Sequence, residues 1–174
     1  MKRILIGTSL AIALTSVALG QSELAATAKA TFVDSKGKQI GHAELMQTPN
    51  GVLIEAEVHG LPPGAHAFHI HEKGQCKTDD QFKTAGDHFN PSGKKHGYET
   101  TGGPHAGDMP NQFVGQDGVL KLNVINPNVS LGTGKDSLFD QDGSALVIHA
   151  KADDYKSQPA GDAGDRIACA VVEK

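Results

Sequence analysis

The sequence has no tryptophan, and its two tyrosines and six phenylalanines make up only 5% of 174 residues. It has instead 21 glycines and eight prolines, residues that interrupt regular structure. At 38% hydrophobic residues, a chain of this length can still bury one substantial core. The composition therefore disfavours long helices and favours a single domain of short segments joined by turns.

The chain also lacks an excess of positive charge. It has 16 basic and 20 acidic residues, which gives a net charge of −4. Acidic proteins bind nucleic acid poorly, so we expect no nucleic-acid partner. A small anion is still an acceptable ligand, because a local positive patch can oppose the overall charge.

Long apolar runs are absent except at the start of the chain. The segment MKRILIGTSLAIALTSVALG joins Lys2 and Arg3 to an apolar run that ends in small residues. This layout is typical of a secretory signal peptide, residues 1–20, with cleavage after Gly20. A membrane anchor is the alternative, but polar residues dilute the run and no basic flank follows it. We therefore expect residues 21–174 to form one mature, exported domain that is not in a membrane.

Cysteine is scarce as well, since Cys76 and Cys169 are the only two. Disulfides form in oxidising compartments, so an exported chain with two cysteines is expected to join them. Two reduced thiols are the alternative, and they would require a cytosolic location.

Short segments of alternating or continuous apolar residues predict strands. They cover residues 26–33, 38–47, 51–60, 65–71, 119–125, 145–150 and 166–173. Between Glu72 and Asn111 the periodicity disappears, and a second irregular segment covers residues 151–165. A loop as long as the first is usually functional or disordered, and its histidines favour function. The prediction is one all-β domain, a sandwich or barrel, that carries two long loops.

Histidines are placed where metal ligands are expected. His69 and His71 are two residues apart on a predicted strand, so both side chains lie on one face. That pair alone leaves three interpretations open: metal ligands, partnered core histidines or solvated residues. His149 lies on another apolar strand, where an unpartnered ring would be costly. His42, His59 and His66 have no second ligand nearby, and we expect no metal role for them.

The long loop adds His88, His96, His105 and Asp108, flanked by glycine and proline. Three nitrogens and one carboxylate are the set that a closed tetrahedral zinc site needs. A polar loop that happens to contain histidines is the alternative.

Five segments together resemble the copper/zinc superoxide dismutases, in particular the secreted bacterial branch. They are AFHIHEKGQC, GDHFNPSGKKHG, GGPHAGDMPN, ALVIHAKADD and GDAGDRIACAVV, and they occur in the family's order over nearly the whole mature chain. The resemblance implies a Greek-key, immunoglobulin-like sandwich or flattened barrel of about eight antiparallel strands. It also implies a periplasmic enzyme, a monomer or homodimer, that converts superoxide to oxygen and hydrogen peroxide.

The resemblance also implies the ligands and the role of each neighbouring residue. Copper is expected at His69, His71, His88 and His149, and zinc at His88, His96, His105 and Asp108, so that His88 bridges both metals. Asp153 is expected to hydrogen-bond His69 and His96, Arg166 to hold the superoxide anion, and Cys76 to pair with Cys169. A periplasmic copper or zinc carrier of the same fold is the alternative function, although such carriers commonly lose copper ligands or the arginine.

One feature departs from the expected pattern. Asp165 directly precedes Arg166, where a carboxylate would weaken the attraction of an anion. We therefore expect lysines of the segment between Cys76 and His88, such as Lys77 and Lys83, to contribute to that attraction.

Overall fold

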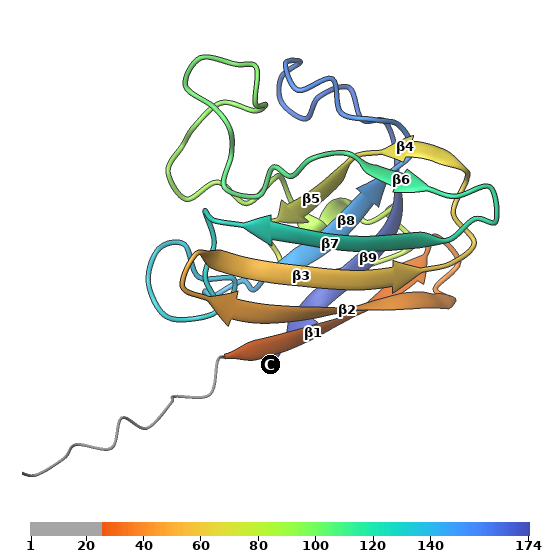
Figure 1. Cartoon of the computed structure of the whole chain (residues 1–174), viewed down its shortest axis with the longest axis horizontal. Helices are drawn as coiled ribbons and strands as arrows, with labels where there is room; N and C mark the ends of the chain where they lie inside the picture. Colours follow the sequence, from red (N-terminus) through yellow and green to blue (C-terminus); the bar gives the residue numbers. More distant parts are fainter. Residues whose placement is uncertain (1–25) are drawn as a thin grey trace, which may run out of the picture.

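The structure is a computed structural model that describes residues 26–174. Every strand pair in it is antiparallel (Figure 1). The strands are β1 (Thr27–Asp34), β2 (Gln39–Thr48), β3 (Gly51–Val58), β4 (Gly64–His66), β5 (Phe68–His71), β6 (Gln112–Val114), β7 (Leu120–Asn126), β8 (Ala145–His149) and β9 (Arg166–Glu173), and η1 (Lys83–Ala85) is a 3-10 turn. The expected signal peptide lies outside the described residues. Within residues 26–174, no helix is long and apolar enough to span a membrane.

Seven strands form one sheet in the order β5-β8-β9-β1-β2-β3-β7, and β4 pairs with β6 in a second, small sheet. The large sheet curls, so that β5, β8 and β9 lie behind β1, β2, β3 and β7 (Figure 1). The connections from β3 to β5 and from β7 to β8 cross from one side of the sheet to the other. Such crossings are typical of Greek-key folds. The predicted all-β class with antiparallel strands and long loops is therefore confirmed.

The strand predicted over residues 65–71 is two strands that belong to different sheets. β4 pairs with β6, and β5 pairs with β8. Ala67 lies between them, and its N–H donates to the carbonyl of Lys151 while its own carbonyl accepts the N–H of His149. Alternating apolar residues run through both strands, so the sequence does not show the change of partner. β6 was not predicted, because three residues are too few to show a period.

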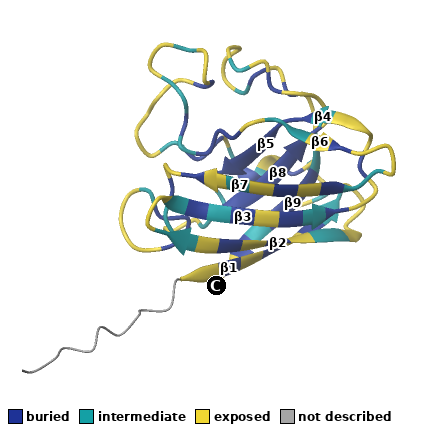
Figure 2. Cartoon of the chain, in the orientation of Figure 1, coloured by how far each residue is buried: buried dark blue, intermediate teal, exposed yellow. Residues whose placement is uncertain are grey.

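The core lies inside the curl of the large sheet. Strands β1, β2, β3 and β7 bury alternate residues, which gives the banded pattern of Figure 2. Phe32, Leu45, Ile54 and Leu120 point into this core and are almost fully buried. Alternation with period two is what a sheet with one solvated face requires.

Strands β5 and β8 are different, because every residue in them is buried. Leu146 and Ile148 of β8 pack into the main core. Val147, on the opposite face, packs against Phe82 of the long loop and against Cys169. The long loop thus covers the outer face of β5 and β8, and side chains on that face are shielded from water.

The expected disulfide between Cys76 and Cys169 is present and joins residues 93 positions apart. It fastens the start of the long loop to β9, beside the cluster that contains Phe82. The disulfide therefore helps to hold the loop over the outer face.

Replacing Cys76, the less buried cysteine, by serine should destabilise the fold. The chain-entropy model for a closed loop of this length gives about 4–5 kcal/mol as an upper figure. Guanidinium unfolding of Cys76→Ser and of the reduced wild type should show similar losses in the free energy of unfolding. Equal stability of Cys76→Ser and the oxidised wild type would contradict this prediction.

Candidate metal centre

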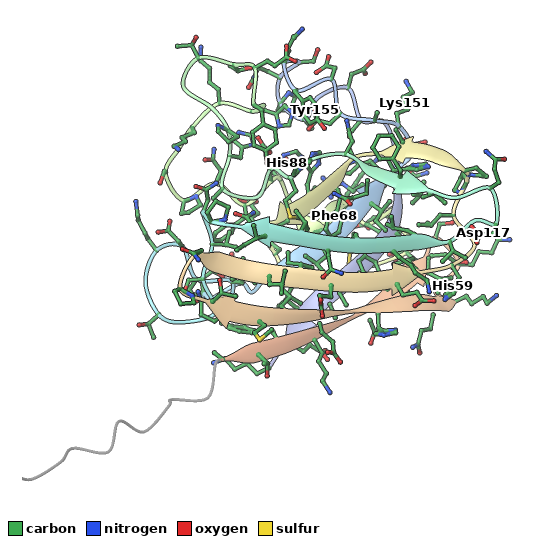
Figure 3. The ribbon with its side chains drawn as sticks, viewed as in Figure 1. His59, Phe68, His88, Asp117, Lys151 and Tyr155 are labelled. Carbon is green, nitrogen blue, oxygen red and sulfur yellow. A yellow bond between two sulfur atoms is a disulfide. The ribbon has the colours of Figure 1, made fainter. Side chains whose placement is uncertain are left out.

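Four buried histidines meet on the outer face of β5 and β8. His69 pairs with Val147 in the β5–β8 register, so His71 and His149 lie on the same face. His88 forms an isolated β-bridge to His71 where the long loop meets β5. Figure 3 labels His88 at this place in the fold. One nitrogen from each of these four rings lies within 4.8 Å of the other three. Four imidazole nitrogens so close together form a metal-binding group, here called the strand group.

The long loop docks along β5 as if it were a further strand. The N–H of Phe89 donates to the carbonyl of Ile70 at 2.8 Å, and the N–H of Ile70 donates to the carbonyl of Gly107 at 2.9 Å. These bonds satisfy the edge of β5, which would otherwise be unpaired. Gly107 is needed here, because a Cβ at this position would lie 2.2 Å from the carbonyl oxygen of Ile70. The docking fixes the backbone on both sides of His88.

A second set of donors, the loop group, consists of His88, His96, His105 and Asp108. The Nδ1 atoms of His88 and His96 lie 2.7 and 3.1 Å from Asp108 Oδ1. The Nδ1 atoms of His88 and His105 lie 3.4 Å apart. Ligands at about 2.0–2.1 Å from a tetrahedral zinc ion are about 3.3 Å from one another. The donors of the loop group therefore already have the spacing that zinc requires.

His88 belongs to both groups. Its Nδ1 faces Asp108, while its Nε2 is buried without a hydrogen-bond partner among the described residues. Nδ1 of His69 is also buried without such a partner, and the two ring centroids are 4.0 Å apart. Buried polar atoms are nearly always hydrogen-bonded, so two unpartnered nitrogens in one cluster fit the binding of a metal ion. Imidazole nitrogens suit copper, and the strand group therefore fits a copper ion.

Contacts on the far side of the rings decide which nitrogen faces the strand group. Nδ1 of His71 lies 2.9 Å from the carbonyl oxygen of Gly86, and Nδ1 of His149 lies 3.3 Å from that of Gly164. A carbonyl oxygen only accepts, so both rings donate an N–H there and keep Nε2 unprotonated. The two Nε2 atoms are 3.4 Å apart, inside the group.

Asp153 connects the two groups. Its Oδ2 accepts the Nε2–H of His69 at 2.9 Å, and its Oδ1 accepts the Nε2–H of His96 at 3.0 Å. The N–H of Tyr155 also donates to Oδ1, at 2.6 Å. Burial raises the pKa of Asp153, but these hydrogen bonds outweigh it and hold that pKa well below its usual range. One carboxylate on the loop of residues 151–165 thus orients a ring in each group.

Burial keeps three rings of the strand group neutral in the metal-free protein. It lowers the pKa of His149 to about 3, and it lowers that of His88 to about 4 although Asp108 opposes the shift. Burial and the neighbouring rings also hold the pKa of His71 well below its ordinary value. These rings are therefore neutral at pH 7, which is the form that binds metals.

A cavity of about 310 Å³ opens onto the strand group and is lined in part by Arg166 and by four of the candidate ligands, His71, His88, His105 and His149. The Nη1 and Nη2 atoms of Arg166 donate to the carbonyls of Phe82 and Gly86, each at 2.6 Å. Gly86 also accepts from His71, so one carbonyl links the arginine to a candidate copper ligand. Two larger hollows on the surface, of about 550 and 610 Å³, contain none of the candidate ligands.

Three further side chains position the ligands, and sequence reasoning missed them. The side-chain amide of Asn111 accepts the backbone N–H of Asp153 and donates to its carbonyl. The side-chain amide of Gln158 likewise accepts the backbone N–H of His96 and donates to its carbonyl. The hydroxyl of Tyr98 donates to the carbonyl of Asp108. Tyr98 and Asn111 follow ligands by two and three residues, which was a weak signal, whereas nothing in the sequence indicates Gln158.

The three histidines without an expected metal role lie outside both groups. His42 and His59 are exposed. His66 is buried, and its ring nitrogens lie 2.7 and 2.8 Å from the carbonyl oxygens of His149 and Pro62. It therefore helps to anchor the end of β8.

The fold and the two donor groups define a β-sandwich metalloprotein with two adjoining sites that share one imidazole. Residues 39–172 match the family described as copper/zinc superoxide dismutase (SODC), and the chain belongs to this family. It is therefore an oxidoreductase that acts on superoxide and uses copper and zinc, as the sequence resemblance implied.

Named relatives agree with this assignment. The chain is 54% identical over 147 residues to Superoxide dismutase [Cu-Zn] 2 of Aquifex aeolicus, which covers 83% of this chain and 85% of the relative. It is 42% identical over 150 residues to Superoxide dismutase [Cu-Zn] of Caulobacter vibrioides, and the match covers 84% of this chain and 86% of the relative. A solved superoxide dismutase-like protein from Bacillus subtilis has a TM-score of 0.79 and 40% identity, covering 82% of this chain and 96% of its own.

Zinc binding to the metal-free protein should release about one proton at pH 7.5. Burial lowers the pKa of His96, but hydrogen bonds to Asp108 and Asp153 raise it to about 9. Zinc must displace that proton from the ring, so its apparent affinity should rise about tenfold per pH unit between pH 6.5 and 9. Calorimetric titration in two buffers of different ionisation enthalpy measures the protons released.

Because its pKa is raised, the protonated His96 ring stabilises the metal-free fold. This contribution to the free energy of unfolding is fully present below pH 6.5 and is lost as the pH rises through about 9. Asp153→Asn removes one of the two carboxylates beside His96 and should reduce the proton release. Proton release of zero in the wild type would contradict the prediction.

Gly161→Ala should disturb Asp153, whereas Gly164→Ala should not. Both glycines have a positive φ, +68° and +72°, so the backbone strain of the two substitutions is matched. A Cβ on Gly161 would overlap Asp153 Oδ1 and lie 2.7 Å from His96 Nε2, while one on Gly164 meets only Lys151 at 3.4 Å or more.

Zinc affinity of the metal-free variants, measured against a competing chelator, should fall about 10- to 100-fold for Gly161→Ala, the range typical of lost outer hydrogen bonds. It should change little for Gly164→Ala. Equal affinities in the two variants would show that contact with Asp153 does not matter.

Proposed function

We propose that this chain dismutates superoxide at a copper ion bridged by His88 to a zinc ion. The observation that carries the proposal is the position of the His88 ring, whose Nδ1 lies in the loop group and whose buried Nε2 lacks a partner in the strand group. The proposed copper ligands are His69, His71, His88 and His149, and the proposed zinc ligands are His88, His96, His105 and Asp108.

The reaction consumes two superoxide anions and two protons and yields one oxygen and one hydrogen peroxide. Copper, when bound, supplies the one-electron redox chemistry, and zinc, which has none, supplies a fixed positive charge. Nε2 of His88 holds a proton when it is not a ligand and delivers it to the reduced oxygen species. Nδ1 remains on the zinc side, which keeps the ring in place during this transfer.

Arg166 is proposed to hold the superoxide anion in the cavity. A guanidinium group has five N–H donors, and the carbonyls of Phe82 and Gly86 take two of them. Donors therefore remain for a small anion beside the strand group. Asp153 is proposed to fix the tautomers of His69 and His96, through which it acts on both metal sites.

We also propose that residues 1–20 are a signal peptide and that residues 21–174 function in the bacterial periplasm as one domain. The basic and apolar layout of the leader supports this, and so does the disulfide, which is typical of oxidising compartments. The mature chain is proposed to be free of the membrane, as a monomer or homodimer.

A periplasmic metal carrier of the same fold is the second candidate, since a solved neighbour is described only as superoxide dismutase-like. The complete pair of donor groups and the presence of Arg166 beside the cavity favour the enzyme. The two candidates differ in whether the metal-loaded protein consumes superoxide.

Metal analysis of purified residues 21–174, combined with a superoxide-decay assay, distinguishes them. The enzyme should contain about one copper and one zinc per chain, and chelation should abolish its activity. Arg166→Leu should keep both metals and lose about tenfold in kcat/KM, because the local attraction for the anion is removed. Metal binding without superoxide decay would support the carrier instead.

A further inference from the structure

The cavity in front of the strand group has two acidic residues in its wall. Glu72 and Asp87 both line it, together with Arg166. Glu72 follows His71 and Asp87 precedes His88, and the N–H of Glu72 donates to the carbonyl of Asp87 at 2.9 Å. The two carboxylates therefore stand on paired segments, each next to a candidate copper ligand in the chain.

Nearby basic groups do not neutralise the charges of these two carboxylates equally. Glu72 has Lys73 at 4.0 Å, an exposed contact of little strength. Asp87 is exposed, and no lysine or arginine nitrogen of residues 26–174 lies within 4.0 Å of its carboxylate. Asp87 does lie close enough to Arg166 to interact with the guanidinium electrostatically, as does Asp80. The positive field of the arginine is thus opposed from the long loop.

Of the charged residues that the sequence singled out, only Arg166 lines this cavity. Asp165, the neighbour of Arg166 in the chain, is exposed and absent from the cavity wall, and so are Lys77 and Lys83. Apart from its histidines, the charged side chains of the wall are two acids and one base, Arg166. The acids that line the cavity are therefore Glu72 and Asp87.

We propose that Asp87, assisted by Glu72, slows the approach of superoxide to the copper site of this chain. A like charge in the wall of a narrow cavity lowers the local concentration of an anion and its rate of association. The effect is strongest in dilute buffer and weakens as salt screens it, with a Debye length of about 8 Å at physiological ionic strength. The inference rests on the proposed position of copper.

The test is the isosteric variant Asp87→Asn, with Asp165→Asn as the matched control. In dilute buffer, kcat/KM for superoxide should rise about two- to fivefold in Asp87→Asn. As salt is added, the kcat/KM of Asp87→Asn should approach that of the wild type. Glu72→Gln should give a smaller increase because of Lys73, and Asp165→Asn should give none.

A second measurement does not depend on turnover. Azide is a small anion that binds copper, and its affinity for the resting copper-loaded protein can be measured by optical titration. Azide affinity should rise in Asp87→Asn by a factor similar to that of the rate, at equal metal content. It should remain at the wild-type value in Asp165→Asn.

The outcomes separate this inference from the function itself. A wild type that binds copper and azide without consuming superoxide would contradict the proposed activity, while the azide affinities would still test the role of Asp87. An active wild type whose rate and azide affinity are unchanged in Asp87→Asn would overturn the inference. A larger response in Asp165→Asn than in Asp87→Asn would overturn it as well.

Discussion

The hydrogen bonds of Asp153 to His69 and His96 are the interaction on which the rest of the site depends. They join a ring on β5 to a ring on the long loop through a carboxylate on the second loop. Asn111 holds the backbone of Asp153, and Gln158 holds the backbone of His96. Three segments far apart in the chain are thereby held together, and each ring turns its Nδ1 toward one of the two donor groups.

Burial on both faces of β5 and β8 explains the chemistry of the rings. An imidazolium in a dry environment is costly, so the rings of His71, His88 and His149 are neutral near pH 7. His96 is the exception, because two carboxylates surround it and raise its pKa to about 9. The strand group thus contains neutral rings that suit a metal, while the loop group holds a proton on His96 that a metal bound there must displace.

The substrate side of the site is organised by one carbonyl and two acids. The carbonyl of Gly86 accepts from both His71 and Arg166, so the segment that follows Cys76 positions a candidate copper ligand and the arginine of the cavity together. The same stretch of loop carries Asp87, whose charge opposes the arginine. The charge of the cavity wall is therefore a balance between Arg166 and the acids of the long loop.

The sequence by itself determined the all-β class, because period-two strands are local patterns that folding preserves. Its resemblance to the family implied two donor sets, and the structure brings the residues of each set together. Three features were decided only in the tertiary structure. Residues 65–71 divide into β4 and β5, the amide of Gln158 binds the backbone of His96, and Asp165 lies outside the cavity wall. Each of these features depends on which distant segments come into contact. Residues 151–165 contact the residues of the loop group, and the edge of β5 pairs with the long loop. Spacing along the chain carries no information about such contacts, since they arise when the curled sheet brings its two loops together.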